Sequence, residues 1–289
     1  MTDNERFREA EALLALGRKD EASNLFLDLF NNTEDIILRL NSGLELNRSL
    51  DQVQDREKLL VIASETIKLA QRLTNKDTKA IALCYKGLLQ LQSKVRNLDK
   101  MKRINLSPDW FEFSLENDKD NYQEMNEESK FFEEDAWKCL DEAKDIAQNS
   151  EDYALKSKVY SMLSQAYLQK FFELRFTNLG KNWLQRWLAV HNYDHFFFRG
   201  EARAKLKSIH LNMDEFALKS IKIAEQADDM AEKTLACYNY ANSLQSVNNF
   251  IKARKYIKTA RKIADDLSDN QMLANIAVLE KRAKTRIKV

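Results

Sequence analysis

Residues 237–263, CYNYANSLQSVNNFIKARKYIKTARKI, predict two short helices that pack against each other in antiparallel fashion. Apolar residues recur at spacings of three and four, typical of one helix face, at Cys237, Tyr240, Ala241 and Leu244. A second such face follows at Ala253, Ile257, Ala260 and Ile263, after a turn at Asn248-Asn249. The small alanines allow a close helix crossing. Because one helix pair cannot bury its apolar face alone, we expect neighbouring pairs.

Similar units occur along the chain. Near the start, Gly17 closes one helix by adopting positive φ, and Ala22 faces the crossing in the next. Residues 36–73 form a further pair, and residues 78–98 open another with Gly87 at a close approach. Ser107-Pro108 predicts a new helix start. Later apolar stripes lie at 136–146, 160–167, 217–227 and 271–286, and we expect about fourteen helices in all.

The pattern resembles the tetratricopeptide-repeat family, most clearly in residues 237–263 and next in residues 13–29. That resemblance implies an all-α fold, a right-handed α-solenoid of stacked antiparallel helix pairs. We expect a single helical-repeat domain over residues 1–289. It divides into N-terminal repeats at 1–98, an irregular middle with insertions at 99–200, and C-terminal repeats at 201–289. The family's typical Trp at the start of the first helix and Pro after the second are absent.

Composition supports this reading. The 289 residues include only five Gly and one Pro, too few for the tight turns of a sheet protein. Cys84, Cys139 and Cys237 are far apart and predict reduced core thiols in a cytoplasmic protein. The charged N-terminus predicts no signal peptide, and no apolar window is long enough for a membrane span.

Net charge is +1, but charge is unevenly distributed. Residues 112–152 contain 15 acidic and 4 basic residues, whereas residues 252–289 contain 11 basic and 4 acidic ones. Solvated outer helix faces explain such runs. Alternatively, the basic end meets an acidic partner, such as the acidic middle of another copy, or a phosphate backbone.

The family resemblance implies that inner-face side chains of the first helices bind an extended peptide. Amide side chains suit this role because they both donate and accept hydrogen bonds. The matching positions here are Asn41, Tyr85, Gln165, Tyr238, Asn239, Asn242 and Gln245. Family members that hold a terminal carboxylate use a Lys where this chain has Tyr238, which disfavours that function.

Other patterns point elsewhere. His191 and His195 have metal-ligand spacing, with Asp194 or Glu201 as further ligands, but the Glu of metalloprotease helices is missing and we expect no metal or cofactor. The Arg186/His191 and Arg203/His210 pairs resemble those of HEPN-type helical ribonucleases, in which Arg and His act on RNA. The aromatic residues between 171 and 198 form either core or a binding platform.

The sequence contains no phosphate-binding Gly-rich loop and no nucleophile elbow. We therefore expect a non-enzymatic interaction scaffold that binds a peptide or helix of a partner protein. A helical ribonuclease or nucleic-acid-binding protein is the alternative hypothesis.

Overall fold

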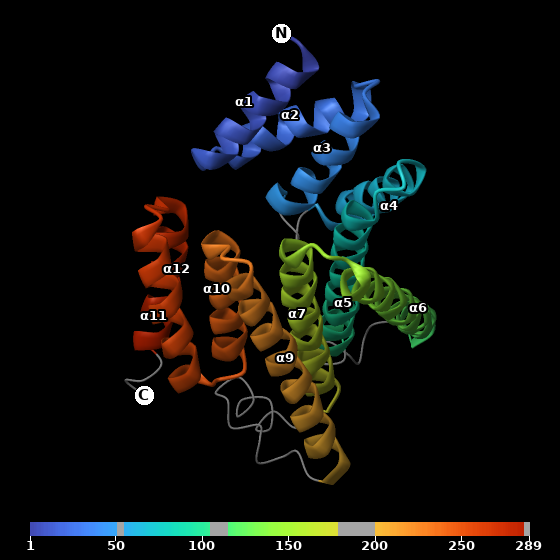
Figure 1. Cartoon of the computed structure of the whole chain (residues 1–289). Helices are drawn as coiled ribbons and strands as arrows, with labels where there is room; N and C mark the ends of the chain where they lie inside the picture. Colours follow the sequence, from blue (N-terminus) through green and yellow to red (C-terminus); the bar gives the residue numbers. More distant parts are fainter. Residues whose placement is uncertain (51–54, 105–114, 179–199, 286–289) are drawn as a thin grey trace.

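A computed structural model of the chain describes residues 1–50, 55–104, 115–178 and 200–285 (Figure 1). These ranges form eleven helices and no strand. The helices are α1 (Asp3–Ala15), α2 (Lys19–Asn32), α3 (Ile36–Ser49), α4 (Arg56–Arg72), α5 (Lys76–Ile104), α6 (Leu115–Asn149), α7 (Tyr153–Asn178), α9 (Gly200–Gln226), α10 (Met230–Ser246), α11 (Phe250–Asp266) and α12 (Asn270–Thr285). The all-α prediction is confirmed for this part of the chain.

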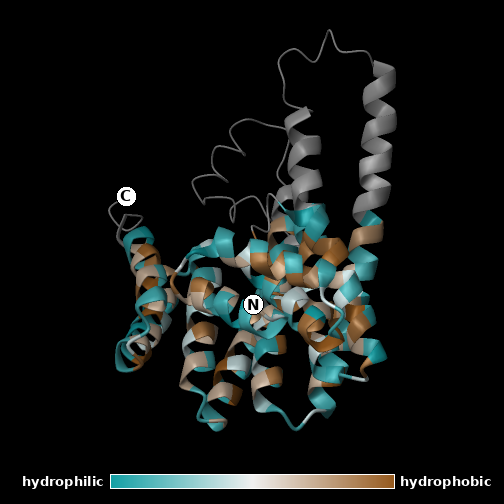
Figure 2. Cartoon of the chain, turned by 90° about the horizontal axis from the view of Figure 1, so that it is seen from above, coloured by the Kyte–Doolittle hydropathy of each residue, from teal (hydrophilic) through white to brown (hydrophobic). Residues whose placement is uncertain are grey.

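Consecutive helices pack side by side as antiparallel pairs. The predicted C-terminal pair corresponds to α10 and α11, with Cys237, Ala241 and Leu244 fully buried opposite Ala253 and Ala260. Ala22 is fully buried on α2, and Gly17 has a φ of 77°, as predicted. Figure 2 shows hydrophobic and hydrophilic residues alternating along the helices, as expected for helices with one buried side.

A two-residue turn recurs between helices. Its first residue has a positive φ of 52 to 65°. The N–H of its second residue donates a hydrogen bond to the carbonyl oxygen five residues before it, which ends the helix. The second residue is Asn or Asp, and its side chain accepts a hydrogen bond from the third residue after it, which begins the next helix. The turns are Thr74-Asn75, Asp228-Asp229, Asn248-Asn249 and Ser268-Asp269, the last three at twenty-residue intervals. This recurring turn explains how repeats form with so few glycines.

The helices form two layers. The first helices of the pairs, α1, α3, α5, α7, α10 and α12, contact one another in sequence order, so they form a continuous row. Among described residues, the second helices α2, α4, α6, α9 and α11 contact their neighbours in sequence far more than each other. Because the first helices lie closer to one another than the second helices do, the row curves toward the first helices. The first helices therefore form the inner layer. This arrangement is compatible with a solenoid.

The two ends of the row come together. A β-carbon placed on Gly17, in the turn between α1 and α2, would lie 3.5 Å from Oε1 of Gln271 at the start of α12. In Figure 1 the α1–α2 pair lies above the turn between α11 and α12, where α12 starts. The row therefore curves enough for its first turn to reach its last helix.

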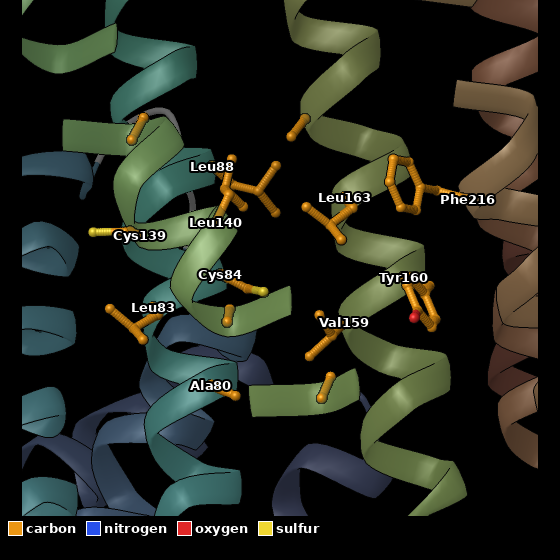
Figure 3. Close-up of a cluster of buried hydrophobic side chains, with 14 of the residues drawn as sticks. Ala80, Leu83, Cys84, Leu88, Cys139, Leu140, Val159, Tyr160, Leu163 and Phe216 are labelled. Carbon is orange, nitrogen blue, oxygen red and sulfur yellow. The ribbon is translucent and has the colours of Figure 1, made fainter. Parts of the chain in front are cut away.

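The core consists of successive small clusters, each shared by neighbouring helices. One joins α1 to α4 around Phe26, whose ring lies 5.4 Å from that of Phe7. The largest joins α5, α6 and α7 with Phe216 of α9 (Figure 3). A third cluster joins α7, α9, α10 and α11, and a fourth joins α10, α11 and α12. Cys84, Cys139 and Cys237 are buried free thiols in these clusters, as predicted.

Gly87 fills its predicted role at a close crossing. A β-carbon there would lie 2.8 Å from Cγ of Leu140 and 2.9 Å from the carbonyl oxygen of Ala136, both on α6. Only a residue without a side chain fits this approach of α5 to α6 without displacement.

The predicted number of helices is wrong for the described chain, which has eleven where about fourteen were expected. Helix α6 extends over 35 residues, and the stripe predicted at 136–146 is only its C-terminal part. The charged residues before that stripe lack apolar periodicity, yet Glu and Lys favour helix as strongly as most apolar residues. The helix start predicted at Ser107-Pro108 lies outside the described residues.

Candidate peptide-binding face

Polar side chains line one side of the inner-layer helices at helical spacing. They are Asn41, Glu45 and Arg48 on α3, Tyr85 on α5, Lys158, Ser161 and Gln165 on α7, and Glu232, Asn239 and Asn242 on α10. We call these residues the inner polar face. Because their spacing on each helix is three, four or seven, each set lies on one helix side.

The charged members of this face influence one another across helices. Arg48 and Glu45 lie within electrostatic reach of Tyr85, and Lys158 lies within reach of both Glu45 and Glu232. Side chains from α3, α5, α7 and α10 therefore converge in the middle of the inner layer.

Burial controls the ionisation of this centre. Burial raises the pKa of Tyr85 to about 12, so its hydroxyl keeps its proton at neutral pH. Burial also raises the pKa of Glu232, which is only 6% exposed, and that of Glu45. The hydroxyl oxygen of Ser157 lies 3.4 Å from Oε1 of Glu232 and 3.1 Å from the hydroxyl oxygen of Ser220. The centre of the inner layer is thus filled by the chain's own polar groups.

The amide side chains beside this centre form fewer hydrogen bonds within the chain. Nδ2 of Asn239 donates a hydrogen bond to Oγ of Ser161, 3.2 Å away. The amides of Asn41, Gln165 and Asn242 are half-buried, and no side-chain hydrogen bond among the described residues involves them. These three amides remain able to donate to and accept from a ligand.

Two predicted residues are occupied by packing against α12. Nε2 of Gln245 donates to the carbonyl oxygen of Leu279 on α12, 2.8 Å away, and Gln245 is only 6% exposed. Tyr238 packs into the cluster shared with α12. Burial raises the pKa of its hydroxyl, whereas the nearby charge of Arg282 lowers it by a smaller amount. Asn41, Tyr85, Gln165, Asn239 and Asn242 thus lie on the inner-layer helices among the residues of the inner polar face, whereas Tyr238 and Gln245 contribute to packing against α12.

The sequence analysis missed the charged members Glu45, Arg48, Lys158 and Glu232. Each lies a multiple of one helical turn from a predicted residue on the same helix, as Glu45 does from Asn41. That spacing was the available signal. It was hidden because charged residues at helical spacing also describe an ordinary solvated surface.

The Arg–His pairs are only partly described. Arg186, His191, His195 and Asp194 lie outside the described residues, as does the side chain of Glu201. Arg203 is exposed, whereas Nε2 of His210 is buried and lies 3.8 Å from Oδ1 of Asp214. The His210 nitrogen therefore faces a carboxylate of its own helix.

Asp214 is itself the centre of a polar network between α9, α10 and α11. Its Oδ1 accepts a hydrogen bond from the hydroxyl of buried Tyr240, and its Oδ2 pairs with Nζ of Lys252, each at 2.6 Å. Burial first and then Asp214 raise the pKa of Tyr240, so this hydroxyl stays protonated as a donor. These contacts connect α9, α10 and α11.

Three carboxylates of the acidic segment are engaged in ion pairs within the described part of the chain. Glu133, Asp135 and Glu142 of α6 pair with Lys94, Lys86 and Lys79 of α5. Lys94 and Lys170 also pair with Glu173 of α7, at 2.8 and 3.1 Å. The carboxylates of α6 thus hold α5, α6 and α7 together, which leaves fewer of them for a second copy.

The aromatic stretch and one surface pocket are the other features that could bear on function. Phe171 and Phe172 are half-buried on α7, whereas the aromatic residues from 179 to 198 lie outside the described residues. A surface pocket lies between the start of α5 and the end of α6, lined by Lys76, Lys79, Glu142 and Asn149 among others. It contains none of the predicted binding residues.

The described ranges contain neither a candidate metal cluster nor a candidate membrane span. No group of three His, Cys, Asp or Glu side chains there is arranged to hold a metal ion. None of the helices described is both long and apolar enough to cross a membrane.

Compared with known protein families and with curated proteins, the sequence has no significant match.

Proposed function

We propose that the chain is a non-enzymatic interaction scaffold, a right-handed tetratricopeptide-like solenoid that binds an extended segment of a partner protein along its inner polar face in the cytoplasm. One observation carries the proposal. Three half-buried amides on separate inner-layer helices, Asn41, Gln165 and Asn242, lack side-chain hydrogen bonds among the described residues.

An extended peptide offers what such amides require. Its backbone alternates N–H and C=O groups that do not bond within the peptide, and an amide side chain can pair with both. Gln165 lies one turn from Ser161, whose hydroxyl receives the Asn239 amide, so α7 and α10 present polar groups side by side. A partner segment that crosses these helices would therefore be held by its backbone, beside the charged centre of the face.

The experiment compares inner and outer amides. A partner is first captured from lysate and its bound segment synthesised. Gln165→Ala and Asn242→Ala should each weaken binding of that segment about three- to tenfold, the range for one hydrogen bond. Gln71→Ala, which removes an exposed amide on α4, is the matched control.

Titration calorimetry on the three variants decides the matter. Unchanged affinity in both inner variants, with intact helicity, would remove this face from the binding site. Self-association and nuclease activity remain separate hypotheses. The first is weakened by the pairing of α6 carboxylates within the chain, and the second by the buried position of the His210 nitrogen.

A further inference from the structure

On the outer surface of α11, a stretch of cations lies between the exposed side chain of Ile251 and the exposed acidic residues Asp265 and Asp266. From residue 252 to residue 264 the helix exposes five residues, and all five are cations: Arg254, Lys255, Lys258, Arg261 and Lys262. We call these five residues the basic face of α11.

Most of these cations lack acidic partners. Arg261 pairs with Glu280 of α12, and Lys255 lies over the ring of Tyr256 at 5.7 Å. Arg254, Lys258 and Lys262 form no ion pair with the described residues. These three follow one another at four-residue intervals, about 6 Å of helix rise each. They therefore form a line of unopposed charge about 12 Å long.

The basic face of α11 lacks what a protein interface needs. Protein interfaces are held by buried aromatic and aliphatic anchors, and cations at their rims add little. Between residues 252 and 264 no apolar side chain is exposed, because Ala253, Ile257, Ala260 and Ala264 are buried in the fold. The apolar side chain of Ile251 beside it is 87% exposed, but a helix that inserts into a lipid surface presents a continuous apolar side.

A nucleic-acid duplex fits these properties better. Its backbone carries one negative charge per about 1.7 Å of axis, and binding gains from the release of counterions without burying apolar surface. Binding to single strands usually adds stacking on exposed aromatic rings, and the basic face of α11 exposes none. We propose that α11 binds the phosphate backbone of a nucleic-acid duplex through Arg254, Lys255, Lys258, Arg261 and Lys262, without reading its sequence.

This inference is independent of the proposed peptide site. The basic face of α11 belongs to the outer layer, whereas the inner polar face lies on α3, α5, α7 and α10. A solenoid with both activities would bring a protein segment and a nucleic acid together. Either activity can fail in experiment without affecting the other.

The test uses the full chain and a fluorescein-labelled DNA duplex of about 20 base pairs, titrated by anisotropy at salt concentrations from about 50 to 200 mM. The variant R254Q/K258Q/K262Q removes three cations from α11. The control K58Q/K68Q/K222Q removes three exposed cations from α4 and α9, so that both variants have the same net charge. Circular dichroism verifies that both fold.

The wild type should bind with an affinity that falls steeply with salt. The α11 variant should bind at least about tenfold more weakly at low salt, and the slope of log affinity against log salt should shrink by about 2.7. Each single substitution should reduce that slope by about 0.9. The control should differ from wild type by less than about twofold.

Three results would overturn the inference. The first is no duplex binding by the wild type at low salt. The second is an equal loss in both triple variants, because net charge alone would then explain binding. The third is binding to phosphatidylserine vesicles or to polyglutamate with no binding to the duplex, which would assign the basic face to a membrane or an acidic protein.

Discussion

Asn239 of α10 donates a hydrogen bond to Ser161 of α7, and this bond connects two helices that are neighbours in the inner layer although α9 lies between them in the chain. Such contacts between first helices determine how tightly the row curves. A pair of small polar residues therefore belongs both to the architecture and to the proposed binding face.

Removing the acceptor of that bond should destabilise the stack. Ser161→Ala is expected to lower the free energy of unfolding by about 1 kcal/mol, because the half-buried Asn239 amide loses its partner. Ser246→Ala removes a hydroxyl that bonds only to Asn242 within its own helix, and it should cost less. Urea unfolding of both variants measures the difference. Equal costs would show that the link between α7 and α10 contributes nothing.

The close approach of α5 to α6 gives a second prediction. Gly87→Ala should destabilise the protein by about 1–2 kcal/mol, because the added carbon meets Leu140 and the backbone of Ala136 at less than 3 Å. This loss should exceed the gain of up to about 1 kcal/mol that alanine brings to a helix. Thermal unfolding checks it, and combining the change with Leu140→Ala should give less than the sum of the two losses. A more stable Gly87→Ala protein would refute the tight crossing.

The ion network at the junction of α5, α6 and α7 gives a third prediction. The Lys94 side chain is 9% exposed and pairs with Glu133 and Glu173. Burial pushes the pKa of Glu133 upward, but hydrogen bonds from Lys170 and Lys94 hold it below its ordinary value. Lys94→Ala should cost about 1–3 kcal/mol, since it leaves Glu133 and Glu173 to share Lys170 alone. Lys79→Ala, which breaks a more exposed pair with Glu142, should cost less than about 1 kcal/mol.

Acid provides an independent check on that network. Because the folded-state pKa of Glu133 is lowered, its stabilising contribution is present above its ordinary pKa near 4.5 and is lost as pH falls through the folded value. The deficit of Lys94→Ala relative to wild type should therefore shrink in acid. Chemical unfolding at neutral pH and near pH 3 measures it. A deficit that is constant with pH would point to lost packing rather than lost charge.

Glu232 should behave in the opposite way. Burial raises its pKa in the folded protein, so the charged form weakens folding at neutral pH, and this penalty disappears below its ordinary pKa near 4.5. Glu232→Gln should raise the free energy of unfolding at pH 7 by about 1 kcal/mol and change it little near pH 4. Glu57→Gln, at an exposed site on α4, is the control. A loss of stability at pH 7 would mean that Lys158 and Arg48 favour the carboxylate over its neutral form.

The sequence was sufficient for the local architecture. The pairing of α10 with α11 follows from apolar periodicity, and the roles of Gly17 and Gly87 follow from the absence of a side chain. These features depend on residues close together in the chain, which periodicity captures. The recurring turns could also have been predicted, because Thr74-Asn75 and Ser268-Asp269 follow the residue preferences of helix ends.

The candidate site was less predictable because it depends on curvature. Gln245 and Asn242 lie less than one turn apart, yet Gln245 bonds to α12 whereas Asn242 lies on the inner polar face. The convergence of Glu45 with Lys158 joins residues more than a hundred positions apart. Periodicity gives the side of a helix, but only the stacking of several helices determines what that side meets.

The most direct test of the central claim is site-specific cross-linking at the inner polar face. A photoreactive benzoylphenylalanine is placed at Gln165, or at exposed Lys68 on α4 as the control, and the protein is irradiated in cell lysate. Mass spectrometry then identifies the attached residues. A scaffold that binds partners on its inner layer should yield one defined partner segment attached at position 165 and none at position 68. No adduct at 165, or the same adducts at both positions, would contradict it.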